Sequence, residues 1–221
     1  LNCRPRSSKS QNISKLAQAG CIAFSQADRA VTDTQVLMRA MQYAATFGYA
    51  VWLQPEDIHL ARNGVAHEGE VASRLGLAGI PSAAEVVALA THIELARVTG
   101  ARLHVCRVSA AESVAMIRDA KARGIAVTAD VSINHLHLID IDIGHYDSNF
   151  RLSPPLRTAR DRDALRAGVI DGTIDAVVSD HTPRPDDAKQ LPFGEAAPGA
   201  TGLEMLLSLV LRFAETAGVP L

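Results

Sequence analysis

Two short stretches of the chain carry the side chains best suited to chemistry. Residues 178–183 read as a strand ending in Asp180 and His181, which are residue types that serve as metal ligand and general base. Residues 103–109 also read as a strand, but Arg107 stands near its end. Because a guanidinium repels a metal ion, the two stretches together predict a catalytic scaffold whose metal chemistry has been lost.

Strand-like runs alternate with amphipathic helical runs from about residue 15 onward. The predicted strands are residues 21–24, 49–53, 102–108, 125–131, 149–152 and 174–179. Repeated strand–helix units favour an α/β fold with a parallel sheet and right-handed crossovers. Six strands fall short of the eight in a closed (β/α)8 barrel, so we expect a barrel that lacks its first two strands. A doubly wound open sheet is the alternative, but no glycine-rich phosphate loop follows an early strand.

Composition bounds the remaining possibilities. The 221 residues are 48% hydrophobic, enough to bury one core, and we expect an irregular segment over 1–14 and a barrel domain over 15–221. A net charge of −2 gives no electrostatic case for nucleic acid or acidic membranes. Three cysteines without metal-finger spacing favour reduced thiols and a cytoplasmic location. No apolar run approaches the ~20 residues that span a bilayer.

Local signals locate the helix ends. Four Ser or Thr residues precede an acidic residue by three positions, which predicts capping-box helix starts at Ser82, Ser109, Thr158 and Thr201. Glycines that follow helical runs predict C-terminal caps at Gly48, Gly100 and Gly124. The histidines in helical or loop contexts are expected to be solvated, namely His59, His67, His92 and His145.

The strand ends supply the candidate site, because functional side chains of such barrels gather at the C-terminal ends of the strands. Of the residues there, only His135 and Asp180 are credible metal ligands, and two ligands rarely hold zinc. Arg107 has two possible roles. It could anchor a carboxylate or phosphate, or it could pair with Asp180, since a buried cation needs an anionic partner.

Several motifs resemble the class I dihydroorotases of the amidohydrolase superfamily, over about residues 16–212. The most specific are residues 68–81, the Ser-Pro-Pro-Leu-Arg-Thr stretch at 153–158, and residues 171–175 leading into Ser-Asp-His-Thr-Pro at 179–183. Pro-Phe-Gly at 192–194 and Gly-Leu-Glu at 202–204 also match. The resemblance implies a (β/α)8 metal-dependent hydrolase barrel.

The resemblance also implies a set of metal ligands, most of which this sequence lacks. The His-x-His pair of the first strand is absent, and Gln26-Ala27-Asp28 replaces the stretch that carries the bridging carboxylate. Arg107 stands at the position of the next histidine. His135 is retained, and Asp180 matches the last ligand and catalytic base, so these two residues are a vestigial metal pair.

The substrate-binding positions have changed as well. Ser153 stands where the family has a substrate-facing Asn, and Arg184 where it has His. Together with Arg107, these are the candidate substrate-binding residues, and we expect Asp180 to be idle as a base. Several independent losses within the chain leave the enzyme class open between a working and a degraded cyclic amidohydrolase.

The pattern is similar to the non-catalytic dihydroorotase homologues that accompany aspartate transcarbamoylase in some bacteria. This resemblance implies a structural subunit in a hetero-oligomer, with the aspartate transcarbamoylase catalytic subunit as partner and no cofactor. One alternative is an active dihydroorotase, a zinc enzyme that interconverts carbamoyl-aspartate and dihydroorotate. The other is a metal-free binding barrel in which Arg107 and Arg184 hold an acidic metabolite.

Overall fold

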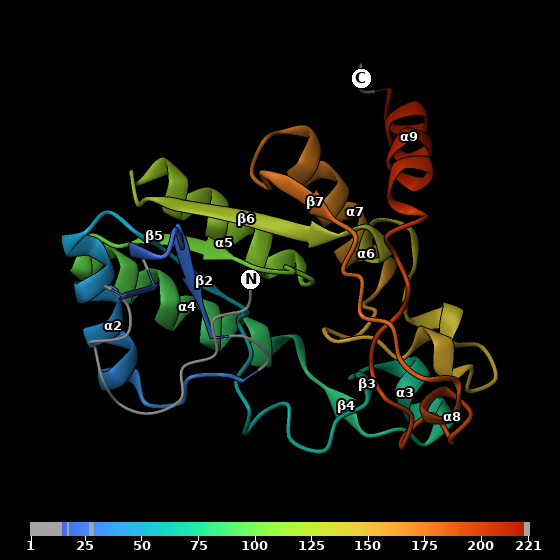
Figure 1. The fold of residues 1–221 in the computed structure, drawn as a ribbon. Coiled ribbons are helices and arrows are strands. Elements are labelled where there is room, and N and C mark those ends of the chain that lie inside the picture. The colour runs from blue at the N-terminus through green and yellow to red at the C-terminus, as the bar shows by residue number, and fades with distance from the viewer. Residues whose placement is uncertain (1–14, 17, 27–28, 219–221) are drawn as a thin grey trace.

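The fold is built around a parallel five-stranded sheet with helices packed on one face (Figure 1). The computed structural model describes residues 15–16, 18–26 and 29–218, so the segment 1–14 lies outside the described residues. The strand order is β1-β2-β5-β6-β7, and every pair is parallel. The strands are β1 Ala23–Ser25, β2 Ala50–Leu53, β5 Arg102–Val105, β6 Val127–Ser132 and β7 Ala176–Val178.

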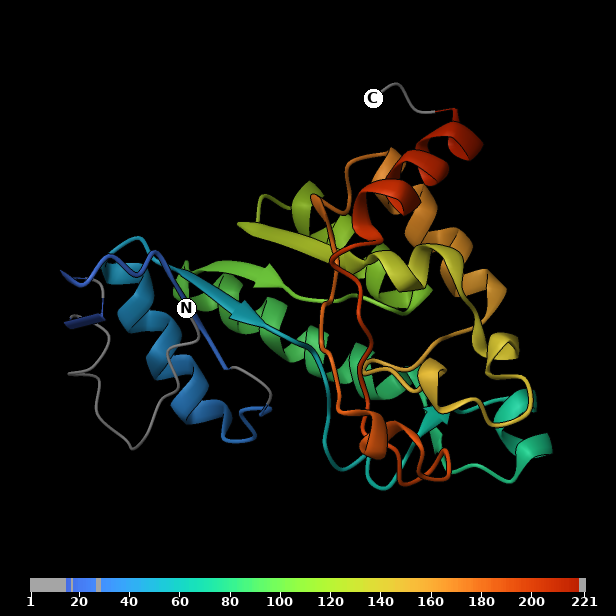
Figure 2. The same cartoon turned by 45° about the vertical axis from the view of Figure 1, so that its right-hand side comes forward.

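The helices follow the strands in the alternating order that the sequence predicts. They are α2 Thr34–Thr46, α4 Ser82–Thr99, α5 Ala111–Ala122, α6 Ile133–His137 and α7 Ala159–Ile170, with α9 Leu206–Ala217 at the C-terminal end. Both ribbon views show α9 beside α6, beyond the end of β7 (Figures 1 and 2). The parallel sheet and its crossovers confirm the predicted α/β class.

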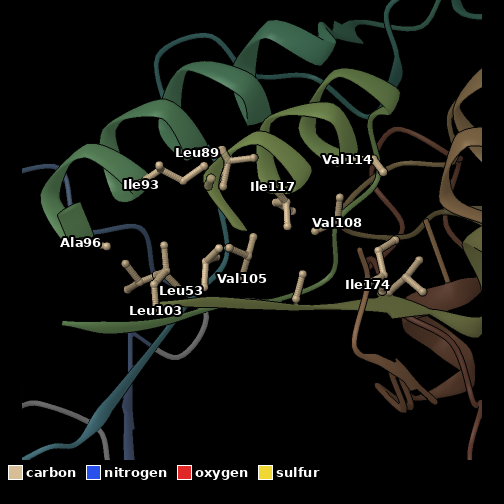
Figure 3. Packing of buried hydrophobic residues seen from close by; sticks show 14 of the residues in the cluster. Leu53, Leu89, Ile93, Ala96, Leu103, Val105, Val108, Val114, Ile117 and Ile174 are labelled. Atoms are coloured by element: carbon tan, nitrogen blue, oxygen red, sulfur yellow. The ribbon is translucent and has the colours of Figure 1, made fainter. Parts of the chain in front are cut away.

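Side-chain alternation along the strands divides the sheet into two faces. Leu53, Leu103 and Val105 point toward α4 and α5 and pack against apolar side chains of those helices (Figure 3). The opposite face is concave and open to solvent, and Trp52 on it is 43% exposed. This second face corresponds to the interior of a barrel.

A long excursion between β2 and α4 carries elements that the sequence did not predict. It contains a two-stranded parallel sheet of β3 Ala66–His67 and β4 Gly79–Ile80, with α3 Glu70–Leu75 between the strands. Two 3-10 helices, Asp140–Ile143 and Ser148–Phe150, and the short helix α8 Asp186–Lys189 lie in later loops.

The predicted strand at 149–152 is wrong. The Asp147 side chain accepts a 2.9 Å hydrogen bond from the Asn149 backbone N–H and turns the chain into the 3-10 helix Ser148–Phe150. A side chain that bonds its own backbone offers an alternative to strand pairing. The main sheet therefore has five strands in the described part of the chain, one fewer than expected.

The capping signals had mixed outcomes. Thr158 and Asp161 form the predicted capping box at the start of α7, with the Thr158 hydroxyl 2.6 Å from the Asp161 carboxylate. Helix α4 begins at Ser82 without a side-chain cap, and α5 and α9 begin at Ala111 and Leu206, beyond the predicted cap residues. Gly100 has the predicted left-handed conformation, with φ of 69°.

None of the described helices is both long enough and apolar enough to cross a membrane.

Candidate functional site

Arg107 lies at the centre of the C-terminal end of the sheet. It follows β5 in a left-handed conformation, with φ of 56°, and its guanidinium reaches across the ends of the neighbouring strands. Nη1 lies 3.2 Å from Asp180 Oδ1 and 3.4 Å from the Ser153 carbonyl oxygen, and Nη2 donates to the Gln54 side-chain carbonyl. The predicted pairing of Arg107 with Asp180 is confirmed.

Asp180 is held in this pair rather than presented to solvent. Its side chain is 9% exposed, and its backbone also has a left-handed conformation, with φ of 48°. Burial raises the pKa of the Asp180 carboxyl, and the Arg107 guanidinium partly offsets that increase. The carboxylate is therefore neutralised by a side chain of the protein, at the position where the resemblance implies a metal ligand and base.

His135 is buried beneath the strand ends. It lies in α6 and is 2% exposed, and its Nε2 is 3.1 Å from the Pro155 carbonyl oxygen. Burial lowers the pKa of this imidazole to about 4, so the ring is neutral at neutral pH. Its Nδ1 is buried and has no hydrogen-bond partner among the described residues.

The residues at the implied ligand positions do not fit a binuclear metal centre. Gln26 offers an amide that donates to the Gln54 carbonyl oxygen at 3.0 Å, and Arg107 offers a cation. Asp28 lies outside the described residues. Within the described ranges, neither His135 nor Asp180 belongs to a group of three potential metal ligands. Two separated donors beside a guanidinium cannot hold a pair of divalent ions.

Arg184 lies in a different environment from Arg107. Its Nε donates to the Pro198 carbonyl oxygen at 2.7 Å, and the side chain lines a cavity of about 810 Å³. Other cations line the same cavity, namely Arg166, Lys189 and Arg212, whereas Arg107 is not among its lining residues. Burial and the nearby cations Arg151 and Arg184 lower the pKa of Lys189. The structure therefore does not bring Arg107 and Arg184 together around one cavity.

A buried ion network that was not predicted from the sequence supports this end of the sheet. Arg157 and Glu85 are each 3% exposed, with Arg157 Nη2 3.9 Å from Glu85 Oε2. Glu85 accepts 3.0 Å hydrogen bonds from the backbone N–H groups of Ser109 and Ala110. Arg157 donates to the Ser109 hydroxyl at 3.1 Å and to the Ile80 carbonyl oxygen at 2.8 Å. The Pro-Pro-Leu-Arg motif thus fixes the loop that follows Arg107.

The one group of three potential metal ligands among the described residues lies below Arg107 on the concave face. It consists of His104, Cys106 and Asp130, with one donor atom of each within 4.8 Å of the others. The signal in the sequence was the spacing of two residues between His104 and Cys106, which places both on one face of a strand.

Comparison with known sequences gives a consistent set of relatives. The family described as "Dihydro-orotase-like" matches residues 6–113. The chain is 45% identical over 199 residues to a dihydroorotase from Anaeromyxobacter sp. (strain K), covering 89% of this chain and 46% of that protein. It is 42% identical over 200 residues to a dihydroorotase-like protein from Pseudomonas putida, covering 90% of this chain and 47% of that protein. The chain therefore spans about half the length of these relatives.

Solved structures share the fold at lower identity. L-hydantoinase from Arthrobacter aurescens has a TM-score of 0.82 at 23% identity, over 95% of this chain and 49% of that chain. The dihydroorotase of Saccharomyces cerevisiae in complex with 5-fluoroorotic acid has a TM-score of 0.74 at 17% identity, over 94% of this chain and 58% of that chain. By sequence this chain is similar to dihydroorotases and dihydroorotase-like proteins, and the described residues share the fold of part of the solved hydantoinase and dihydroorotase structures.

Proposed function

We propose that this chain is part of a dihydroorotase-like protein of pyrimidine biosynthesis that has no dihydroorotase activity and serves as a structural subunit for aspartate transcarbamoylase. The observation that carries the proposal is the ion pair between Arg107 and Asp180 at the strand ends. It places a fixed cation where the reaction would need metal ions and a free carboxylate.

The loss of activity follows from the chemistry of cyclic amide hydrolysis. Water must become a hydroxide near neutral pH, and in this family two metal ions lower its pKa. Asp180 is engaged by Arg107, and His135 bonds a backbone carbonyl beneath the sheet. Within the described ranges, neither residue belongs to a group of three potential metal ligands.

The structural role rests on the resemblance set out above and on the kind of relatives found. Proteins from two Pseudomonas species, at 42% and 41% identity, are named dihydroorotase-like rather than dihydroorotase. In this proposal the barrel keeps its fold and its buried Arg157–Glu85 network but has lost its catalytic activity. Its role is then to bind another protein through its surface. In this proposal the surface contacts the transcarbamoylase.

The second candidate is an active dihydroorotase that uses zinc. The relatives named dihydroorotase, at up to 45% identity over 199 residues, favour it. In this case the remaining half of the longer protein would have to supply metal ligands that compensate for Arg107. Turnover separates the two candidates directly.

Co-expression with the aspartate transcarbamoylase from the same source tests the structural role. We expect the full-length protein to co-elute with the transcarbamoylase in a fixed ratio on size-exclusion chromatography with light scattering. Each protein run alone is the control for chance overlap of the peaks. Separate elution at micromolar concentrations of both would remove the proposal's main support.

A further inference from the structure

We propose that His104, Cys106 and Asp130 bind one divalent cation of the zinc type on the concave face of the sheet. This site is distinct from the positions that the family uses for its metals, one of which is Arg107. It is also independent of the proposed structural role.

Strand geometry brings the three side chains together. His104 and Cys106 are two residues apart, on β5 and just after it, so their side chains point to the same face. In the parallel register His104 lies opposite Thr128 of β6, which places Asp130 opposite Cys106. One donor atom from each of the three residues lies within 4.8 Å of the other two.

Partners on the outer side orient two of the three donors. His104 Nδ1 lies 2.8 Å from the Thr128 hydroxyl, while Nε2 lies 2.9 Å from Asp130 Oδ2. The second Asp130 oxygen, Oδ1, accepts a 2.7 Å hydrogen bond from the Arg107 backbone N–H. Trp52 packs beside the imidazole, with ring centroids 4.6 Å apart. Metal-binding histidines and carboxylates are typically held by such outer hydrogen bonds.

The donor set selects the class of ion. One imidazole nitrogen, one sulfur and one carboxylate oxygen suit Zn²⁺ or Co²⁺, whereas Mg²⁺ and Ca²⁺ prefer oxygen ligands alone. On binding, the Cys106 S–H bond breaks, the thiolate sulfur bonds the metal and the proton passes to the buffer. The hydrogen between His104 Nε2 and Asp130 Oδ2 moves to His104 Nδ1, which then donates to the Thr128 hydroxyl, so Nε2 and Oδ2 are both free to bind the ion. Three protein ligands leave a fourth position for water.

Arg107 is the obvious objection to a cation here, and its contacts answer the objection. The guanidinium is directed to Asp180 and Gln54 at the strand ends. Only the Arg107 backbone N–H contacts Asp130. The positive charge of Arg107 is therefore paired with the carboxylate of Asp180, which is not one of the three proposed ligands.

Cobalt(II) is the probe, because a thiolate ligand gives a sulfur-to-cobalt charge-transfer band in the near ultraviolet. The full-length protein is stripped of metal and titrated with Co²⁺ in a Cys3→Ser background. We expect one equivalent to bind, with this band and the visible bands of a four-coordinate ion. Cys106→Ser should lose the near-ultraviolet band and more than about tenfold in affinity, the loss that even an outer partner can cause. Cys21→Ser is the matched control and should keep both.

A milder variant keeps the test decisive if Cys106→Ser fails to fold. Thr128→Val preserves the shape of an exposed side chain and removes the hydroxyl that orients His104. It should keep the charge-transfer band and weaken Co²⁺ binding by about tenfold. A band that survives in Cys106→Ser, or no Co²⁺ binding to the folded wild-type protein, would overturn the proposal. Because turnover and transcarbamoylase binding are separate readouts, either proposal can fail without the other.

Discussion

At the scale of single residues, the pairing of Arg107 with Asp180 is the main polar contact at the C-terminal end of the sheet. The Asp180 side chain is 9% exposed and that of Arg107 is 22% exposed. A carboxylate buried to this extent needs a partner to remain charged, and Arg107 provides it. In the inactive protein that we propose, the same contact would also keep Asp180 from acting as a base.

A double-mutant cycle tests this pairing. Arg107→Met leaves Asp180 buried without a cation, so we expect the free energy of unfolding at pH 8 to fall by about 2 kcal/mol, less than for a fully buried pair. Arg107→Met combined with Asp180→Asn should recover most of that loss. Urea unfolding of the four proteins measures the coupling, and strictly additive losses would show that the pair contributes nothing.

Buried histidines predict a loss of stability in acid. Burial lowers the pKa of His92 on α4 to about 4, below the ordinary value of 6.5. The unfolded chain therefore binds more protons between these values, and stability that is present above pH 6.5 is lost as the pH falls toward 4.

The variant His92→Leu should remove this part of the pH dependence. The free energy of unfolding of His92→Leu minus that of wild type should be about 2 kcal/mol larger at pH 5 than at pH 8. His145→Gln at an exposed position is the control, and its pH profile should follow that of wild type. Equal slopes for His92→Leu and wild type in urea unfolding between pH 5 and 8 would contradict this account of His92.

At the scale of elements, helix α4 connects the motif loops to the sheet. Its residue Glu85 accepts hydrogen bonds from the backbone just before α5 and faces Arg157 from the Pro-Pro-Leu-Arg loop. Glu85 thus holds together segments that are distant in sequence, and it does so with a charge that is almost wholly buried.

Removing this charge should be costly. We expect Glu85→Ala to lower the free energy of unfolding by about 3–5 kcal/mol, because it leaves Arg157 buried without its carboxylate partner. Glu94→Ala on the same helix is the matched control, since Glu94 pairs with Arg97 at the surface, where solvent screens the pair and it contributes little to stability. Similar losses for both variants by urea unfolding would refute a special role for Glu85.

The elements were largely predictable because their signals are local. Short strand-like runs between amphipathic helical runs predicted all five strands of the sheet, and the Thr158–Asp161 spacing predicted one helix start. The predicted strand at 149–152 failed because the Asp147 side chain turns the backbone. His92 was wrongly expected to be solvated, since it is 7% exposed on a helix packed against the sheet, and only tertiary packing decides which helix face is covered.

The candidate site was predictable only in part, for the same reason. Arg107 and Asp180 both end parallel strands, so their meeting followed from topology. The cluster of His104, Cys106 and Asp130 depends on the register between β5 and β6, which the sequence does not state. The role of Glu85 was hidden as well, because its position in the chain suggested a helix cap.

At the scale of the whole molecule, the described residues form an open sheet with β1 and β7 at its edges. Its concave face carries Trp52 and the His104 cluster, and its strand ends carry the Arg107–Asp180 pair. The chain spans about half the length of its relatives, so their activity applies to it only as a proposal. The central claim is that the strand ends of this barrel no longer support hydrolysis.

Turnover of the full-length protein tests that claim most directly. Dihydroorotate hydrolysis and carbamoyl-aspartate cyclisation are measured with and without added zinc, for wild type and for Arg107→His. We expect no rate above the uncatalysed reaction for either protein, because Arg107→His restores one ligand while Gln26, Ser153 and Arg184 remain, and residues of one site act as a unit. Zinc-dependent turnover by the wild-type protein that Asp180→Ala abolishes would contradict the account.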